Sequence, residues 1–107
     1  MAKTYRKTAT IQAIQFTGDN VEEILSDSDF VNCEIKRGFR LVGEEVIHPL
    51  ENFLDFDSTI EFEFVWYIKT LEGPLEITPG SWAASGGADD FWAIKPDRFK
   101  DTYEEVQ

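Results

Sequence analysis

Apolar and polar residues alternate most clearly between positions 60 and 69 of the sequence. One set of alternate positions is apolar throughout: Ile60, Phe62, Phe64, Trp66 and Ile68. The positions between them are mostly polar: Glu61, Glu63, Val65, Tyr67 and Lys69. Because successive residues of a strand point to opposite faces, this pattern predicts a long β-strand over residues 58–70 whose apolar face lies in the core.

Weaker patterns in the N-terminal half predict further elements. Residues 8–16 are rich in Thr and Ile and predict a first strand, in which a change of phase indicates a β-bulge or a strand covered on both faces. Residues 19–30 predict a short helix, with two glutamates in the first turn where the helix dipole favours them. Residues 33–42 predict strand structure that is divided by a turn or bulge at Gly38.

The C-terminal half is predicted to hold more strands and one helical turn. Residues 44–58 fit neither period, and Pro49 cannot donate in a central ladder, so we expect a loop with a short strand at most. Strand patterns follow at 74–78, 81–85 and 91–95. The pair Gly86–Gly87 predicts a hairpin loop between two of these strands, and Pro96 predicts the start of a helical turn.

Together these elements predict an α+β fold with one short helix after the first strand and a helical turn near the C-terminus. Its sheet is expected to be mostly antiparallel and strongly curved, as a partly open barrel. The 107 residues are 42% hydrophobic and 14% aromatic, enough for one core, and we expect a single domain over residues 1–107. The predicted core consists of Ile11, Ala13, Ile24, Leu25, Phe39, Leu41, Ile60, Phe62, Phe64, Trp66, Ile68, Ile77, Trp82, Phe91, Ile94 and Phe99.

The charge of the chain indicates which kind of partner it could bind. The chain has 21 acidic against 10 basic residues, a formal net charge of −11. Direct nucleic-acid binding is therefore not expected, because it depends on Lys and Arg that replace counterions along the phosphates. Residues 19–34 hold six acids and no base, and residues 44–63 hold seven acids and no base. Such segments predict a negative surface that meets a protein with a basic surface. The predicted partner-binding residues are Glu44, Glu45, Asp55, Asp57, Glu61 and Glu63.

Little in the sequence indicates catalysis, a metal or a membrane. One cysteine, Cys33, and one histidine, His48, are too few for a Cys/His zinc site, and the adjacent Asp89 and Asp90 point to opposite faces of a strand. The spacing of Glu61 and Glu63 suits a carboxylate pair in distance only. No apolar run reaches about 18 residues. We therefore expect a cytoplasmic protein that is not an enzyme, with no cofactor, metal or membrane partner.

Both ends of the chain resemble a family of small proteins encoded by tailed bacteriophages and prophages. The start, "YRKTATIQAIQFTGDNVEEIL", is similar to the family's opening, and the stretch from Trp66 onward is similar to its end, whereas residues 30–60 are largely unmatched. The positions that carry the pattern are Thr70, Leu71, Glu72, Gly73, Pro79, Gly80, Trp82, Gly86, Phe91, Lys95, Pro96, Asp97, Phe99, Thr102, Tyr103 and Glu104. The chain departs from it at Ser81, where the family has Asp, and at Ala83, Ala84 and Ile94. The resemblance implies a phage-encoded protein of the host cytoplasm.

We therefore predict a non-enzymatic binding protein, monomeric or homodimeric, that inhibits a host protein through an acidic, DNA-mimic-like surface. A defence nuclease or a nucleic-acid-binding factor is the expected kind of target. Two alternatives stay open. One is a small-ligand or nucleotide binder that uses the aromatic residues Trp66, Trp82, Phe91 and Trp92. The other is a minor virion or assembly component.

Overall fold

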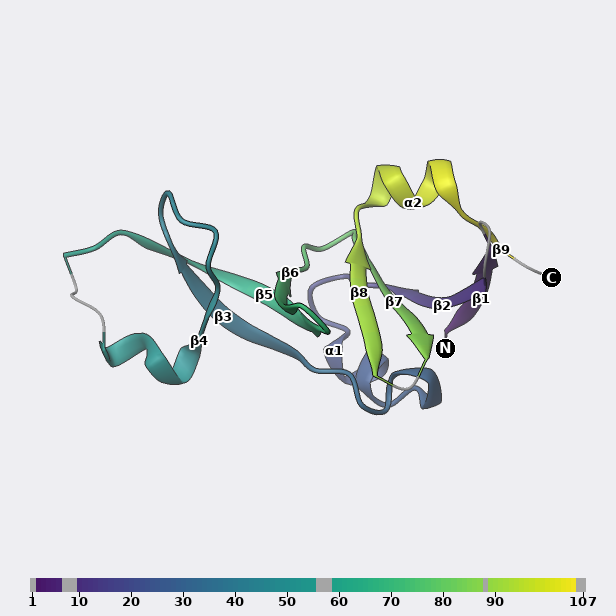
Figure 1. Cartoon of the computed structure of the whole chain (residues 1–107), viewed down its shortest axis with the longest axis horizontal. Coiled ribbons are helices and arrows are strands. Elements are labelled where there is room, and N and C mark those ends of the chain that lie inside the picture. The colour runs from purple at the N-terminus through teal and green to yellow at the C-terminus, as the bar shows by residue number, and fades with distance from the viewer. Residues whose placement is uncertain (1, 7–9, 56–58, 88, 106–107) are drawn as a thin grey trace.

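Two antiparallel sheets make up the computed structural model, which describes residues 2–6, 10–55, 59–87 and 89–105 (Figure 1). The first sheet has the strand order β8-β7-β2-β1-β9, and its strands are β1 (Lys3–Arg6), β2 (Thr10–Gln15), β7 (Trp82–Gly87), β8 (Asp90–Ile94) and β9 (Glu104–Glu105). The second has the order β4-β3-β5-β6, and its strands are β3 (Ile35–Leu41), β4 (His48–Pro49), β5 (Phe62–Thr70) and β6 (Gly73–Glu76). The helical elements are α1 (Val21–Leu25), η1 (Ser28–Phe30), η2 (Leu50–Asp55) and α2 (Pro96–Thr102).

The molecule is elongated, with extents of 52 × 26 × 24 Å. Figure 1 shows why: the first sheet, α1, η1 and α2 form a rounded head, and the second sheet extends from it to one side. We call residues 35–76 the arm. Its far end carries β4 and η2, and we call the described residues there, 41–55 and 59–64, the arm tip.

The base of the arm is anchored in the core of the head. Ile35 of β3 and Ile68 of β5 belong to the same buried cluster as Phe16, Phe30 and Phe91. A second cluster lies under α2, where the ring of Phe99 stacks on Trp82 with centroids 4.0 Å apart. Burial of these large apolar side chains is the main source of stability. The arm tip lies beyond both clusters.

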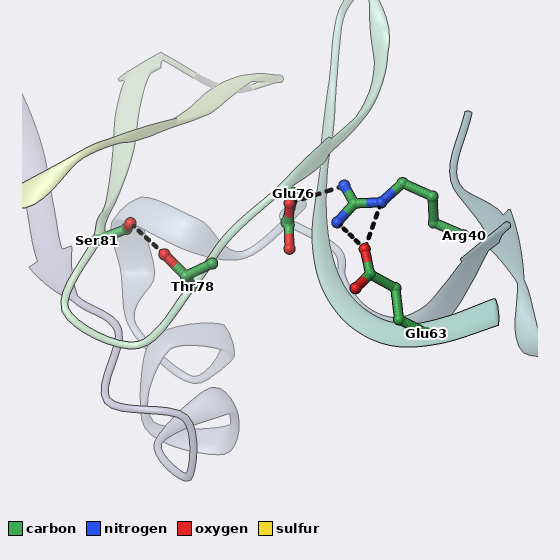
Figure 2. Close-up of polar contacts among 5 residues, drawn as sticks. All are labelled: Arg40, Glu63, Glu76, Thr78 and Ser81. Atoms are coloured by element: carbon green, nitrogen blue, oxygen red, sulfur yellow. Dashed lines mark hydrogen bonds and ion pairs between the residues drawn. The ribbon is translucent and has the colours of Figure 1, made fainter. Parts of the chain in front are cut away.

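A turn precedes β7, and a hairpin loop follows it. Ser81 N–H donates to the Thr78 carbonyl at 2.9 Å across Pro79 and Gly80, and Gly80 has a φ of +99°, as the third residue of a type II turn requires. The hydroxyls of Thr78 and Ser81 also lie 3.1 Å apart (Figure 2). The hairpin predicted at Gly86–Gly87 joins β7 to β8, with a register shift between Ser85 and Gly87. Both turns belong to the head.

The long strand was predicted, but it begins at Phe62 and not at residue 58, and the predicted burial of its outer half was wrong. Phe62 and Phe64 are 39% and 54% exposed, and Ile60 precedes the strand and is exposed, whereas Val65, expected outside, is only 5% exposed. Alternation of apolar and polar residues identifies which side chains share a face of the strand. It does not show which part of that face is covered by other elements. The head covers the base of the strand, so Ile68 is fully buried, whereas Phe64 near the tip is not.

Three further expectations differ from the structure. Gly38 does not interrupt its strand, because β3 runs unbroken from Ile35 to Leu41. The predicted loop over residues 44–58 contains the 3₁₀ helix η2 as well as the short strand β4. The single strongly curved sheet is not confirmed, since the described residues form two separate sheets, neither of them closed.

Candidate functional site

The arm tip is organised by a cluster of aromatic rings. Phe39 and Phe64 are opposite each other in the β3–β5 register, and Phe39 is fully buried. Phe53 of η2 packs against Phe39, Phe62 and Phe64, with centroids 5.3, 4.7 and 5.6 Å away. His48 stacks on the other side of Phe39 at 5.2 Å. These rings hold β4 and η2 against the outer ends of β3 and β5. The tip therefore has a small apolar core of its own.

The same region exposes an unusual amount of apolar surface. Among the described residues, nine large hydrophobic side chains are exposed, and six of them belong to the arm tip: Val42, Val46, Leu50, Ile60, Phe62 and Phe64. Scattered exposed apolar residues are normal, but a local concentration of them is typical of an interaction site. The arm tip is therefore the strongest candidate for a binding surface.

Most of the predicted partner-binding carboxylates lie in the same segment. Glu44 and Glu45 are exposed in the loop that follows β3, and Glu61 is exposed just before β5. Asp55 ends η2, but its side chain lies outside the described part of the chain, as does the whole of Asp57. Residues 41–64 contain seven acids and no lysine or arginine. The exposed apolar side chains thus lie within a strongly negative stretch.

Glu63 differs from its neighbours because it forms an ion pair. Arg40 Nε donates to Glu63 Oε1 at 2.8 Å, its Nη2 bonds the same oxygen, and its Nη1 donates to Glu76 Oε1 at 2.9 Å (Figure 2). The guanidinium therefore links β3, β5 and β6. Glu63 still keeps half of its side-chain surface exposed, and two carboxylates around one guanidinium leave the group negative overall.

The second acidic segment, residues 19–34, lies elsewhere and is largely engaged in structure. It forms α1 and η1 of the head, at a distance from the arm tip (Figure 1). Asp27 accepts hydrogen bonds from the Ala2 and Asp29 N–H groups at 2.7 and 2.9 Å. Glu34 pairs with Lys36 and Lys69, whose hydrogen bonds hold the pKa of its carboxyl below the usual range. The two acidic segments do not form one continuous face.

The four aromatic residues considered for ligand binding are mostly committed to packing. Trp82 stacks on Phe99, Phe91 stacks on Phe30 with centroids 5.8 Å apart, and the Arg37 guanidinium covers one face of Trp66 at 4.7 Å. Trp92 lines a groove together with two cationic side chains, Lys95 and Arg98. That groove has a volume of about 570 Å³ and is lined by Trp92, Ala93, Ile94, Lys95, Arg98, Thr102 and Tyr103.

Most of the residues that carry the phage resemblance lie in the head. Pro79 and Gly80 form its turn, Trp82 and Phe99 its aromatic stack, and Pro96 begins α2. The unmatched residues 30–60 overlap most of the arm tip. No protein-family model, curated protein or solved structure matches the chain.

Within the described ranges, no three His, Cys, Asp or Glu side chains gather as ligands for a metal ion. In the same ranges, no helix has the length and apolarity needed to span a membrane.

Sequence reasoning found the acids of the arm tip but missed its apolar half and Arg40. Phe62 and Phe64 were assigned to the core because they alternate with polar residues. Their exposure could have been inferred from the sequence, because both residues lie between carboxylates in a segment without any base. A buried strand face is seldom enclosed by so much uncompensated charge.

Proposed function

We propose that the chain is a non-enzymatic binding protein whose arm tip captures a protein with a basic surface. One observation supports this most directly. The arm tip exposes six large apolar side chains within a stretch of seven acids and no base. A partner with apolar anchors surrounded by lysines and arginines would complement both properties.

The two properties would contribute differently to binding. Negative charge on a protruding tip attracts a basic partner over distances up to about 8 Å at physiological salt and raises the rate of encounter. Apolar side chains contribute on contact, at roughly 25 cal/mol per Å² removed from water, and that contribution is not screened by salt. Capture is therefore expected to be fast at low salt and to persist in part at high salt.

The resemblance to phage proteins suggests the biological setting for this proposal. In this setting, the partner is a host protein, such as a defence nuclease or a nucleic-acid-binding factor. The arm tip inhibits that host protein by occupying its basic groove. The exposed Phe62 and Phe64 distinguish this tip from a purely electrostatic DNA mimic, whose binding would be lost almost completely in high salt.

The test is capture from a bacterial lysate by the tagged chain. Neutralising four exposed tip carboxylates, in the variant E44Q/E45Q/E51Q/E61Q, should reduce capture of the partner several-fold and slow its association. A control variant, E22Q/E72Q/D89N/D101N, removes the same charge from exposed positions outside the arm tip and should bind normally. Equal capture by both variants and the unmodified chain would refute the proposal.

The groove beside α2 supports a second candidate function, the binding of a small anion that carries a planar ring, such as a nucleotide. It combines two cationic side chains, Lys95 and Arg98, with the rings of Trp92 and Tyr103. Aromatic rings stack on bases, and cations bind phosphates. Titration of tryptophan fluorescence with a panel of nucleotides tests this, and K95Q/R98Q should abolish any change. An unchanged spectrum across the panel would remove this candidate.

A further inference from the structure

The strand β5 has one edge that is paired along most of its length and one that is paired only near its C-terminal end. On one side it pairs with β3 from Phe62 to Ile68. On the other side its partner is β6, whose register covers only Tyr67 to Thr70. The first residues of β5 therefore extend past the end of β6. Figure 1 shows β6 near the head and β5 continuing beyond it toward the arm tip.

Hydrogen bonds next to the strand show which backbone groups face this open edge. Val42 N–H donates to the Glu61 carbonyl at 3.0 Å, and Lys69 N–H donates to the Glu34 carbonyl at 2.9 Å, so odd-numbered residues bond toward β3. Ile77 N–H donates to the Trp66 carbonyl at 3.0 Å, on the β6 side. Backbone groups of an antiparallel strand alternate between its two edges.

It follows that Phe62 and Phe64, which share the parity of Trp66, direct their N–H and C=O groups to the β6 side. Among the described residues, no strand pairs with them there. An unpaired strand edge of this kind is a template for another strand.

We propose that this open edge binds an extended segment of the partner as an added antiparallel strand in which apolar and basic residues alternate. The inference rests on the proposed function and specifies how the partner is recognised. Both existing neighbours of β5 are antiparallel, so the added strand is assigned the same direction. Strand addition of this type takes affinity from backbone hydrogen bonds and specificity from alternate side chains.

The alternation of β5 determines the sequence of its partner strand. Side chains directly opposite each other in a sheet lie on the same face. Residues opposite Phe62 and Phe64 would be apolar and would cover rings that are now half exposed. Residues opposite Glu61 and Glu63 would be basic, because opposite charges stabilise a cross-strand pair.

The ion-pair group of Arg40 prepares this edge. By binding Glu63 of β5 and Glu76 at the end of β6 at the same time, Arg40 holds the two strands in line where the added strand would begin (Figure 2). Order that exists before binding lowers the entropy cost of binding.

A second copy of this chain fits the edge poorly. Antiparallel pairing of two copies about Phe62 would place Glu61 opposite Glu63 on both sides, and like charges directly opposite each other destabilise a sheet. Each copy also carries a net charge of −11. A basic partner removes both objections.

The first experiment uses fluorescently labelled short peptides in which valine and lysine alternate. A scrambled peptide of the same composition, with its lysines together, is the control. We expect the alternating peptide to bind the full chain at least tenfold more tightly in fluorescence anisotropy. Equal binding of the two peptides would overturn the inference while leaving charge-driven capture intact, and failure of the alternating peptide to bind would overturn it as well.

Backbone methylation of the peptide tests the hydrogen bonds themselves. In the assigned pairing, the valine N–H groups face Phe62 and Phe64, and the lysine N–H groups face away. N-methylation of the valines should abolish binding, whereas N-methylation of the lysines should leave it. The opposite result, or equal loss in both, would refute the added strand.

Hydrogen exchange followed by NMR locates the contact on the chain. The amide protons of Phe62 and Phe64 should exchange quickly in the free chain and become protected when the alternating peptide binds. Protection elsewhere without protection of these two amides would refute the assignment. Sedimentation of the free chain as a dimer, with these amides already protected, would assign the edge to a second copy instead.

Discussion

Gly38 offers the most direct test of how the arm is built. It lies in the middle of β3 without a positive φ, so its role is not conformational. A Cβ at this position would lie 2.6 Å from the carbonyl oxygen of His48 and 3.0 Å from the ring of Tyr67, whereas ordinary contacts begin near 3.4 Å. Because the nearer atom is backbone, the substitution G38A must displace β4 from β3.

The size of the effect follows from two opposing contributions. Overpacking in a well-packed site typically costs about 1–3 kcal/mol. Replacement of glycine by alanine also restricts the unfolded chain and returns about 0.4–1 kcal/mol. The midpoints of these two ranges give a net loss of about 1.3 kcal/mol for G38A. In a small domain, each kcal/mol lost lowers the Tm by roughly 4–8 °C.

Denaturant unfolding followed by tryptophan fluorescence measures this loss, with G86A as the matched control. Gly86 also lacks a positive φ, but a Cβ there would meet only the ends of side chains, the Asp90 carboxylate at 3.0 Å and the Trp92 ring at 3.1 Å, which can move. G86A should therefore cost clearly less than G38A. Equal stability of G38A and the unmodified chain would show that β4 does not pack on β3 as described.

Three further outcomes are expected. F99A, which removes a buried ring from the cluster beneath α2, should lower the free energy of unfolding by about 3–5 kcal/mol in a denaturant titration, and a change within about 0.5 kcal/mol would contradict that packing. Hydrogen bonds from Lys36 and Lys69 lower the folded-state pKa of Glu34, so its contribution is present above the ordinary glutamate pKa of about 4.3 and is lost as the pH falls through the lower folded value. E34Q should flatten the acid limb of a stability–pH curve, and an unchanged curve would argue against these ion pairs. Burial raises the pKa of the Cys33 thiol to about 12, so a thiol reagent should label the native chain far more slowly than the unfolded chain, and equal rates would place this thiol at the surface.

The sequence predicted local structure well wherever a residue type has few conformational options. The hairpin at Gly86–Gly87 and the helix that starts at Pro96 were both found in this way. Gly38 was misjudged because the lack of a Cβ serves a tertiary contact with His48, which is ten residues away and not visible in a local pattern.

Long-range pairing was the harder part. The strands β1 and β9 pair with each other across the whole length of the chain, through Tyr5 and Glu105, and neither has a strong pattern of its own. For the candidate site, acidic composition predicted the segment that also holds most of the exposed large apolar side chains among the described residues. The open edge of β5 could not be foreseen, because it depends on where β6 ends relative to Phe64.

Separate construction of head and arm has a consequence for how such a protein could change its target. The turns and stacked rings of the head are fixed by residues outside 41–64, and only the base of β3 and β5 joins its core. New side chains at the outer end would alter what is recognised without disturbing the interior that keeps the molecule folded. The head thus acts as a scaffold and the arm tip as a variable binding region. Selection for a new target and selection for stability would act on different residues.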